Sequence, residues 1–220
     1  MNVVHRLLAL GLVLVANPAW AGEDISKVNG RIVVEAGRQC GDLNTVNGRI
    51  DVGQGARAEH VKTVNGRIVV GARAQTLGLS TVNGDIEIGP HVTVDGRIRT
   101  VNGSVFVDRS SEVSGDVQTT NGSIGLIETQ LKGGIDTVNG DITVGVGSHV
   151  SGGITLHKLG FSLSYRQARK PRVVIGPYAV VDGDLRFDRE VTLYVQRTAK
   201  IGSVSGATVQ RFDGKVAPGR

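Results

Sequence analysis

The sequence is poor in aromatic residues and in cysteine. Aromatic side chains make up 4% of the 220 residues, with a single tryptophan, Trp20, and a single cysteine, Cys40. One cysteine cannot form an intramolecular disulfide framework, so we expect Cys40 to be a small apolar residue of the core. Few aromatic rings are present on which bases could stack, and the net charge of +5 is modest. Nucleic acid is therefore not an expected partner.

Long apolar runs are also missing beyond the first 21 residues. At the start of the chain, Arg6 precedes a short apolar run from Leu7 to Ala16, and Ala19-Trp20-Ala21 has the small residues of a cleavage site. We interpret residues 1–21 as a secretory signal peptide, because this run is too short to span a bilayer. The mature chain is then expected in the periplasm or outside the cell, at the cell surface, with no transmembrane segment.

What the chain does have is a repeated tripeptide, Val-Asn-Gly, with one Thr-Asn-Gly variant. Its asparagines follow one another at intervals of 18, 18, 18, 19, 19 and 18 residues. They are Asn29, Asn47, Asn65, Asn83, Asn102, Asn121 and Asn139. So short a period, with one turn signal per copy, is typical of a solenoid that has one coil per repeat. Since stacked strands lie about 4.8 Å apart, the asparagines are predicted to form a structural corner ladder of side-chain amides.

Aliphatic residues alternate with variable ones on either side of this corner, which indicates strands with one face turned inward. The first predicted inward column is Ile32, Ile50, Ile68, Ile86, Val105, Ile124 and Ile142. The second is Val34, Val52, Val70, Ile88, Val107, Leu126 and Val144, and the third is Leu43, Val61, Leu79, Ile98, Val117, Ile135 and Ile154. The valines of the tripeptide are predicted to form a fourth.

The expected fold is all-β: a single-stranded, three-sided parallel β-helix, or β-solenoid, with about 18 residues per coil and about ten coils. Asparagine and glycine suit its corners because both tolerate positive φ. A corner bulge is expected to hold the extra residue of the 19-residue coils.

After Ile154 the tripeptide is lost, and the segment 166–172 contains four charges and a proline, which predicts an exposed loop. We divide the mature chain into repeat coils at 22–155, a divergent coil with a basic loop at 156–172, C-terminal coils at 173–210 and a tail at 211–220.

The Thr-Val-Asn-Gly-x-Ile-x-Val coils at 27–144 resemble an exported bacterial adhesin repeat family, a group of β-solenoids of largely unknown function. The segment 173–208, with Ile175-Gly176 and Val181-Asp182-Gly183-Asp184, is similar to the bactofilin-like polymer-forming solenoids, which are usually cytoplasmic. Coils of this length fit either helical hand, and the resemblance implies the right-handed one. Neither resemblance implies a catalytic residue.

The sequence shows no catalytic or metal-binding pattern. His60, His91, His149 and His157 occupy different places in their coils and have no partner at metal-ligand spacing. We therefore predict surface histidines and neither a metal nor a cofactor. A glycan-active β-helix enzyme would need clustered carboxylates on one face. Asp85 and Glu87 share a strand, but Asp141 lies three coils further on, so we expect no enzyme.

Arginine follows the Asn-Gly pair in the first three coils, which predicts a stripe of Arg31, Arg49 and Arg67. Stacked guanidinium groups repel one another unless an anionic group lies across them, and they bind carboxylates and phosphates in bidentate fashion. The basic loop is a second candidate for the same partner, through Arg166, Arg169, Lys170 and Arg172. The predicted partner is an acidic glycan or lipopolysaccharide. The alternative is that Asp51, Glu87 and water neutralise the stripe.

Together these features favour an exported, non-enzymatic β-solenoid that serves as a structural or adhesin-like element of the cell surface or periplasm. The first alternative is a self-assembling, polymer-forming solenoid, because solenoid ends expose unpaired strand edges that permit head-to-tail association. A glycan-active enzyme is the second alternative.

Overall fold

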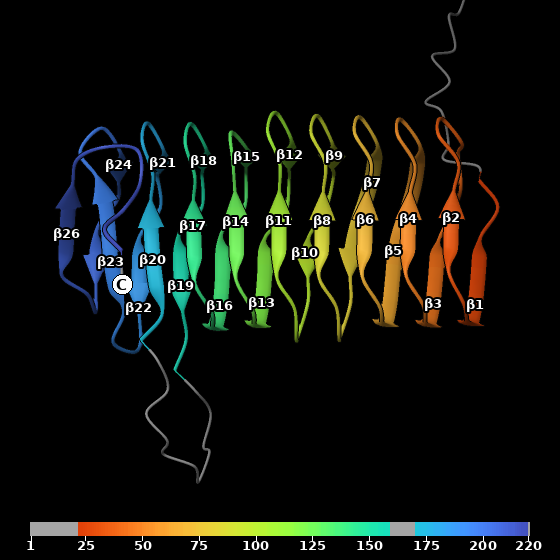
Figure 1. Ribbon diagram of the computed structural model, residues 1–220, viewed down its shortest axis with the longest axis horizontal. Helices are drawn as coiled ribbons and strands as arrows, with labels where there is room; N and C mark the ends of the chain where they lie inside the picture. The colour runs from red at the N-terminus through yellow and green to blue at the C-terminus, as the bar shows by residue number, and fades with distance from the viewer. Residues whose placement is uncertain (1–21, 159–169, 220) are drawn as a thin grey trace, which may run out of the picture.

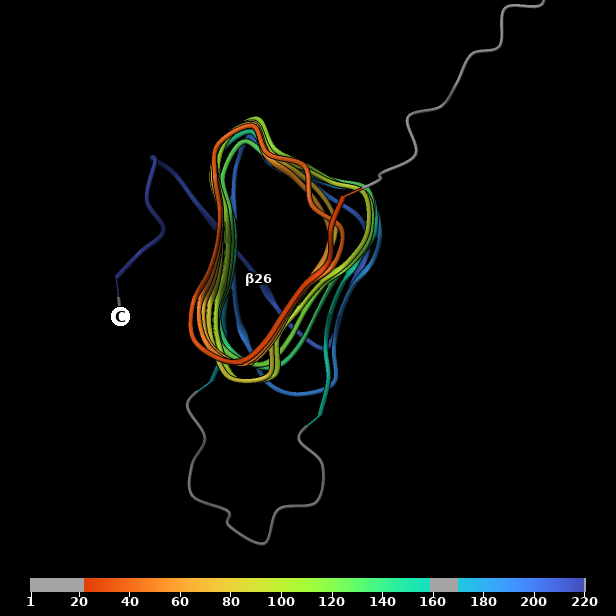
Figure 2. The same cartoon turned by 90° about the vertical axis from the view of Figure 1, so that its right-hand side faces the viewer.

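The chain folds into a stack of parallel β-coils. The computed structural model describes residues 22–158 and 170–219, and within them every regular element is a strand. Figure 1 shows the strands of successive coils side by side along one axis, and Figure 2, which looks along that axis, shows the coils superimposed. One strand position forms a sheet of 10 strands, with one strand from each coil. The predicted all-β parallel solenoid of about ten coils is confirmed.

Each coil contributes strands to up to three faces, and neighbouring coils pair in parallel register. The first face holds β1 (Ile25–Asn29), β3 (Leu43–Asn47), β5 (Arg57–Asn65), β7 (Gln75–Ser80), β10 (Ile98–Arg99), β13 (Val117–Asn121), β16 (Ile135–Asn139), β19 (Ile154–Leu156), β22 (Leu185–Phe187) and β25 (Val204–Ser205). The second face holds β2 (Ile32–Val34), β4 (Ile50–Val52), β6 (Ile68–Val70), β8 (Ile86–Ile88), β11 (Val105–Val107), β14 (Ile124–Leu126), β17 (Ile142–Val144), β20 (Arg172–Ile175), β23 (Thr192–Gln196) and β26 (Val209–Phe212). The third face holds the N-terminal parts of β5 and β7, and then β9 (Thr93–Val94), β12 (Glu112–Val113), β15 (Gln130–Leu131), β18 (His149–Val150), β21 (Val180–Val181) and β24 (Lys200–Ile201).

Aliphatic columns fill the interior of the stack. The three predicted columns on either side of the asparagine corner are buried throughout, and like residues pack on like because the strands pair in register, as Ile50 does with Ile68. Each fully buried side chain contributes about 1.5–3 kcal/mol, so every added coil stabilises the stack. Cys40 also lies in this core, as expected, and burial raises the pKa of its thiol.

The predicted fourth inward column is wrong, because the valines of the tripeptide face outward. Val64 is 40% exposed, whereas the preceding residue, Thr63, is only 5% exposed. Side chains alternate along a strand, and since Val61 points inward, Thr63 must do so too and Val64 must point out. The Thr63 hydroxyl donates to the carbonyl of Gly48 in the preceding coil at 3.0 Å, which satisfies this polar group at the edge of the core.

The glycines of the tripeptide allow adjacent coils to approach closely. Positive φ, the predicted reason for Asn-Gly, occurs only at Gly30 and Gly122 and at none of the corner asparagines. A Cβ on Gly84 would instead lie 2.0 Å from the carbonyl oxygen of Gly66 in the preceding coil. The same contact, at 1.8 to 2.0 Å, would arise at Gly48, Gly66, Gly103, Gly122 and Gly140. The spacing of the coils, rather than φ, therefore requires glycine here.

A different corner, between the second and third faces, does use left-handed backbone. One residue in each of eight successive coils has positive φ there: Gly37, Gly55, Arg73, His91, Ser110, Glu128, Gly147 and Tyr178. For the non-glycine members this conformation costs about 1–2 kcal/mol each, which the stacked coils offset. Sequence reasoning missed this column because its residue type varies from coil to coil.

The extra residue of the 19-residue coils lies at the corner between the third and first faces. Thr76 pairs with Val94 and Leu79 pairs with Ile98, so the later of these coils has one more residue between the two faces. In the earlier coils the strands β5 and β7 run through this corner without a break. The predicted corner bulge therefore begins where the continuous strand ends.

The divergent segment 156–172 interrupts the sequence repeat, but the coils before and after it pair with each other. β19 ends at Leu156 and pairs with β22, while β17 pairs with β20, so the coils resume in register after the interruption. The tail predicted from residue 211 starts later than expected, because Arg211 and Phe212 belong to β26 and pair with β23. Phe212 is also buried, and Figure 2 shows the chain at β26 crossing the outline of the coils.

The predicted signal peptide, residues 1–21, lies outside the described residues. In the part of the chain that the structure describes, no helix has the length and apolar character needed to cross a membrane.

Candidate functional site

The corner asparagines form the predicted ladder on the surface of the first face. The side-chain Nδ2 of Asn47 donates to Oδ1 of Asn29 at 3.0 Å, and the same bond is repeated coil by coil up to Asn121 at 2.8–2.9 Å. The amides from Asn47 to Asn102 each donate and accept within the ladder, so their dipoles are aligned along the axis and strengthen one another. This hydrogen bonding supports a structural role for the ladder.

The arginine stripe is present, but each guanidinium already has a carboxylate partner. Arg31 and Arg49 both contact Asp51 at 2.5 Å, and Arg67 contacts Asp85 at 3.4 Å and Glu87 at 3.1 Å. The arginine side chains are about half exposed, so they can still reach a ligand. An anion would have to compete with these carboxylates. The neutralisation of the stripe by Asp51 and Glu87, which was the alternative prediction, therefore occurs.

Of the residues predicted in the basic loop, Lys170 and Arg172 do not join the arginine stripe. Arg166 and Arg169 lie outside the described residues. Lys170 pairs with Glu190 at 2.6 Å, and Arg172 stacks over the ring of Tyr194 at 5.1 Å and donates to the carbonyl of Pro218 at 2.5 Å. Arg172 lies in β20, five strand spacings or roughly 24 Å from the β6 end of the stripe. It holds the C-terminal segment against the stack.

A shallow groove runs over the outer surface of the first face in the first three coils. It is lined by Ser26, Lys27, Val28, Asn44, Thr45, Val46, Lys62, Thr63 and Val64. The outward valines form an apolar wall along the axis, continued by Val82, which is also exposed. Sequence reasoning missed this groove because it placed the valines inside; the alternation from the buried Leu43 and Val61 could have found it.

The charged groups that line the groove are both lysines. Lys62 points outward from the middle of β5. Lys27 occupies the position that buried threonines hold in the next coils, yet it is exposed, and its ammonium donates to the carbonyl of Arg31 at 2.9 Å. A groove with an apolar wall and two ammonium groups is suited to an extended molecule that carries both apolar surface and negative charge.

Three of the histidines pair with carboxylates on a neighbouring coil. His60 contacts Asp42 at 3.1 Å, and the other pairs are His149 with Asp182 at 2.6 Å and His157 with Asp136 at 3.3 Å. His60, His91 and His157 are exposed, as predicted, and His149 is half-buried with its ring at the surface.

The carboxylate of Asp42 contacts both the backbone N–H and the ring of His60. Partial burial pushes its pKa up, but the backbone N–H and the ring of His60 donate to it and lower the pKa below its ordinary value of 3.8. Glu59 lies beside this pair, with the ligand atoms of all three residues within 4.8 Å of one another. Asp42 and His60 are 18 residues apart, which is one coil, and this spacing is the sequence signal that predicts their contact.

Of the carboxylates considered for catalysis, Asp85 and Glu87 meet at Arg67, and Asp141 does not join them. Asp141 lies at the start of β17, three strand spacings or roughly 14 Å along the second face.

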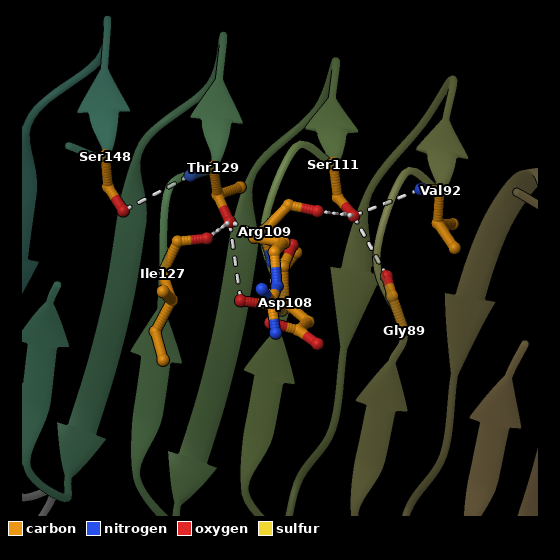
Figure 3. Close-up of polar contacts among 9 residues, drawn as sticks. Gly89, Val92, Asp108, Arg109, Ser111, Ile127, Thr129 and Ser148 are labelled. Atoms are coloured by element: carbon orange, nitrogen blue, oxygen red, sulfur yellow. Dashed lines mark hydrogen bonds and ion pairs between the residues drawn. The ribbon is translucent and has the colours of Figure 1, made fainter. Parts of the chain in front are cut away.

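A buried column of hydroxyl groups lies at the corner between the second and third faces (Figure 3). Ser111 Oγ accepts from the N–H of Val92 at 3.1 Å and donates to the carbonyl of Gly89 at 3.0 Å. Thr129 Oγ1 donates to the carbonyl of Ile127 at 2.9 Å. These side chains hydrogen-bond to the backbone of the corner, which is the role of a structural polar group rather than of an activated nucleophile.

No protein-family model, no curated protein and no solved structure matches this chain. The resemblance to the adhesin repeats and to the bactofilin-like solenoids therefore stays a prediction.

Proposed function

We propose that the protein is an exported, non-enzymatic β-solenoid that acts as an adhesin-like element of the cell envelope and holds an acidic glycan along its first coils. The observation that carries this proposal is the groove of the first face, with an apolar wall made by the outward valines and with lysines as its only charged lining residues.

The groove matches the chemistry of an acidic glycan. A sugar ring presents C–H groups to apolar side chains and hydroxyl groups to amides, and a uronate or phosphate adds the charge that Lys27 and Lys62 complement. Val28, Val46 and Val64 repeat at the strand spacing of about 4.8 Å, so successive coils offer equivalent contacts to a repeating polymer. The arginine stripe is close along the chain, three residues beyond each valine, and can add charge at the next corner.

Binding of the full mature chain to polygalacturonate, with dextran as the neutral comparison, tests the proposal. Polygalacturonate binding is expected to weaken as salt is raised from about 20 mM to about 200 mM, because exposed ion pairs are screened. Binding to lipopolysaccharide is measured separately, and comparison with polygalacturonate shows whether phosphate or carboxylate is the preferred group.

Lys62→Glu should lower the affinity for polygalacturonate roughly threefold to tenfold. Lys132→Glu is the matched control, because Lys132 is also an exposed lysine and pairs with Glu112 on another face. Val64→Asn tests the apolar wall against Val33→Asn, an exposed valine of the second face. Equal effects within each pair of variants would show that the groove is not the binding surface.

Replacing Arg31, Arg49 and Arg67 together by glutamine separates the two candidate surfaces. If the groove carries the binding, this triple variant keeps most of its affinity while Lys62→Glu loses it. A larger loss in the triple variant would place the glycan on the arginine stripe instead.

Self-assembly is the second candidate, and one observation favours it. In the part of the chain that the structure describes, β1 and β2 pair with a neighbouring coil on one side only, so the N-terminal coil presents free strand edges. Lys27 opposes stacking on that edge, because a charged side chain at an inward position is a natural device against edge-to-edge pairing.

Sedimentation velocity over a range of concentrations separates the two candidates. We expect the unsubstituted chain to remain monomeric, and Lys27→Thr, which restores the residue of the other coils, to associate through its N-terminal end. Concentration-dependent rods of the unsubstituted chain would favour the polymer-forming solenoid.

A further inference from the structure

The Val-Asn-Gly repeat places seven Asn-Gly steps along one corner of the solenoid. Asn-Gly is a chemically labile step, because glycine has no side chain to hinder attack by its own backbone nitrogen on the preceding side chain. The glycine nitrogen loses its proton to water and forms a bond to Cγ of the asparagine. The Cγ–Nδ2 bond breaks, ammonia leaves, and a succinimide remains. Water then opens either carbonyl of the ring, which gives aspartate or isoaspartate.

Two sets of hydrogen bonds oppose this reaction in most of the coils. The attacking nitrogen is engaged, because each corner N–H from Gly30 to Gly122 donates to the carbonyl of the asparagine one coil further on, at 2.9–3.0 Å. The side chain that would be attacked is engaged as well, because the ladder amides from Asn29 to Asn121 are joined in series. A donating N–H is harder to deprotonate, and an amide held at its oxygen or nitrogen cannot turn its carbonyl carbon onto the backbone.

Asn139 and Gly140 form the exception. Among the described residues, neither the side chain of Asn139 nor the N–H of Gly140 has a hydrogen-bond partner, although Asn139 pairs through its backbone with Asn121. The hydroxyl of Thr137, in the same strand, also lacks the partner that Thr119 finds in the carbonyl of Gly103.

Within the described residues, the interruption of the repeat explains why the Gly140 N–H has no acceptor and why the Asn139 oxygen has no donor. Thr137 pairs with Leu156, so the position opposite Asn139 in the next coil is that of Lys158, where the tripeptide is absent and β19 has already ended. From Asn29 to Asn102, the asparagine of the next coil supplies both the carbonyl for the glycine N–H and the next amide of the ladder. For Gly122, the next asparagine, Asn139, supplies the carbonyl alone. Asn29, at the other end of the ladder, keeps an engaged oxygen and an engaged glycine N–H.

We propose that Asn139-Gly140 is a site of spontaneous deamidation in the folded protein, and that the solenoid protects the six other Asn-Gly steps. The conversion places a new negative charge at an exposed corner, in the last coil that carries the Val-Asn-Gly tripeptide. When isoaspartate forms, it also inserts a methylene group into the backbone at the position where β16 ends.

Peptide mapping by mass spectrometry tests the proposal on the full mature chain. The folded protein is incubated at mildly alkaline pH and digested at intervals, and the product is identified at each asparagine by the mass change from –NH2 to –OH. Deamidation at Asn139 is expected to be about tenfold or more faster than at any ladder asparagine. The same protein in urea is the control, where the seven steps should react at similar rates. Equal rates at Asn139 and Asn83 in the folded protein would overturn the proposal.

Two variants identify the origin of the selectivity. Asn139→Gln should remove the fast phase of ammonia release and leave the other sites unchanged. Asn102→Ser breaks the ladder in its middle, so Asn121 loses its acceptor and should become a second fast site. If the fast phase persists in Asn139→Gln, or if Asn121 does not speed up in Asn102→Ser, the hydrogen bonds of the ladder do not determine the rates.

Discussion

Replacing the corner glycine Gly84 by alanine should strongly destabilise the stack. The new Cβ would lie 2.0 Å from the carbonyl oxygen of Gly66, and ordinary contact begins at 3.4 Å, so the two coils would have to separate by more than 1 Å at this corner. That movement breaks the bonds from the Gly66 N–H to the Asn83 carbonyl, at 2.9 Å, and from the Thr81 hydroxyl to the Gly66 carbonyl, at 3.1 Å. Two lost hydrogen bonds at about 1 kcal/mol each, with about 1–3 kcal/mol of overpacking, lower the free energy of unfolding by about 3–5 kcal/mol.

Urea denaturation followed by circular dichroism measures this change, and Gly55→Ala is its matched control. Gly55 has positive φ, at 66°, but a Cβ there meets nothing within 4 Å, so only the backbone conformation is unfavourable. We expect Gly55→Ala to cost about 1–2 kcal/mol. If Gly55→Ala destabilises the protein as much as Gly84→Ala does, the close approach of the coils is not the reason for glycine at the corner.

Three further predictions concern stability. Val64→Ser should change the free energy of unfolding by less than about 0.5 kcal/mol, whereas Ile68→Ala should lower it by about 2–5 kcal/mol in the same urea titration; a large loss in Val64→Ser would mean that the valine is buried after all. Arg73→Gly should raise the thermal midpoint, because relief of the left-handed conformation contributes about 1 kcal/mol, and an unchanged or lower midpoint would contradict the assigned φ. The lowered pKa of Asp42 contributes stability above the ordinary value of 3.8 that is lost as the pH falls through the folded-state pKa, so Asp42→Asn should flatten the acid limb of a stability-against-pH curve. An acid limb with the same slope in both proteins would show that the Asp42–His60 contact does not form in solution.

Much of the architecture is predictable from the sequence because one local pattern is repeated in register. The spacing of Asn29 to Asn139 gives the coil length, and the alternation around Ile50 and Ile68 gives the inward face. The valines of the tripeptide were wrongly predicted to point inward because they are hydrophobic. Val64 follows an inward threonine, so the period of two along the strand places it on the outer face.

Other features depend on contacts between coils, which a single repeat does not display. The role of Gly84 follows from the distance to the carbonyl of Gly66, and the left-handed corner at Arg73 has no preferred residue type. The sequence does not determine whether the arginine stripe is neutralised, because the contact between Arg31 and Asp51 depends on the register between two neighbouring coils. The groove went unnoticed for the same reason as the valines that line it.

The affinity of the full mature chain for polygalacturonate at low salt, compared with its affinity for dextran, tests the central functional claim most directly. We predict salt-sensitive binding to the acidic polymer, weak or absent binding to the neutral one, and a polygalacturonate affinity roughly threefold to tenfold lower in Lys62→Glu but unchanged in Lys132→Glu. Equal binding of both polymers, or binding that Lys62→Glu leaves unchanged, would contradict the proposal that the groove holds an acidic glycan.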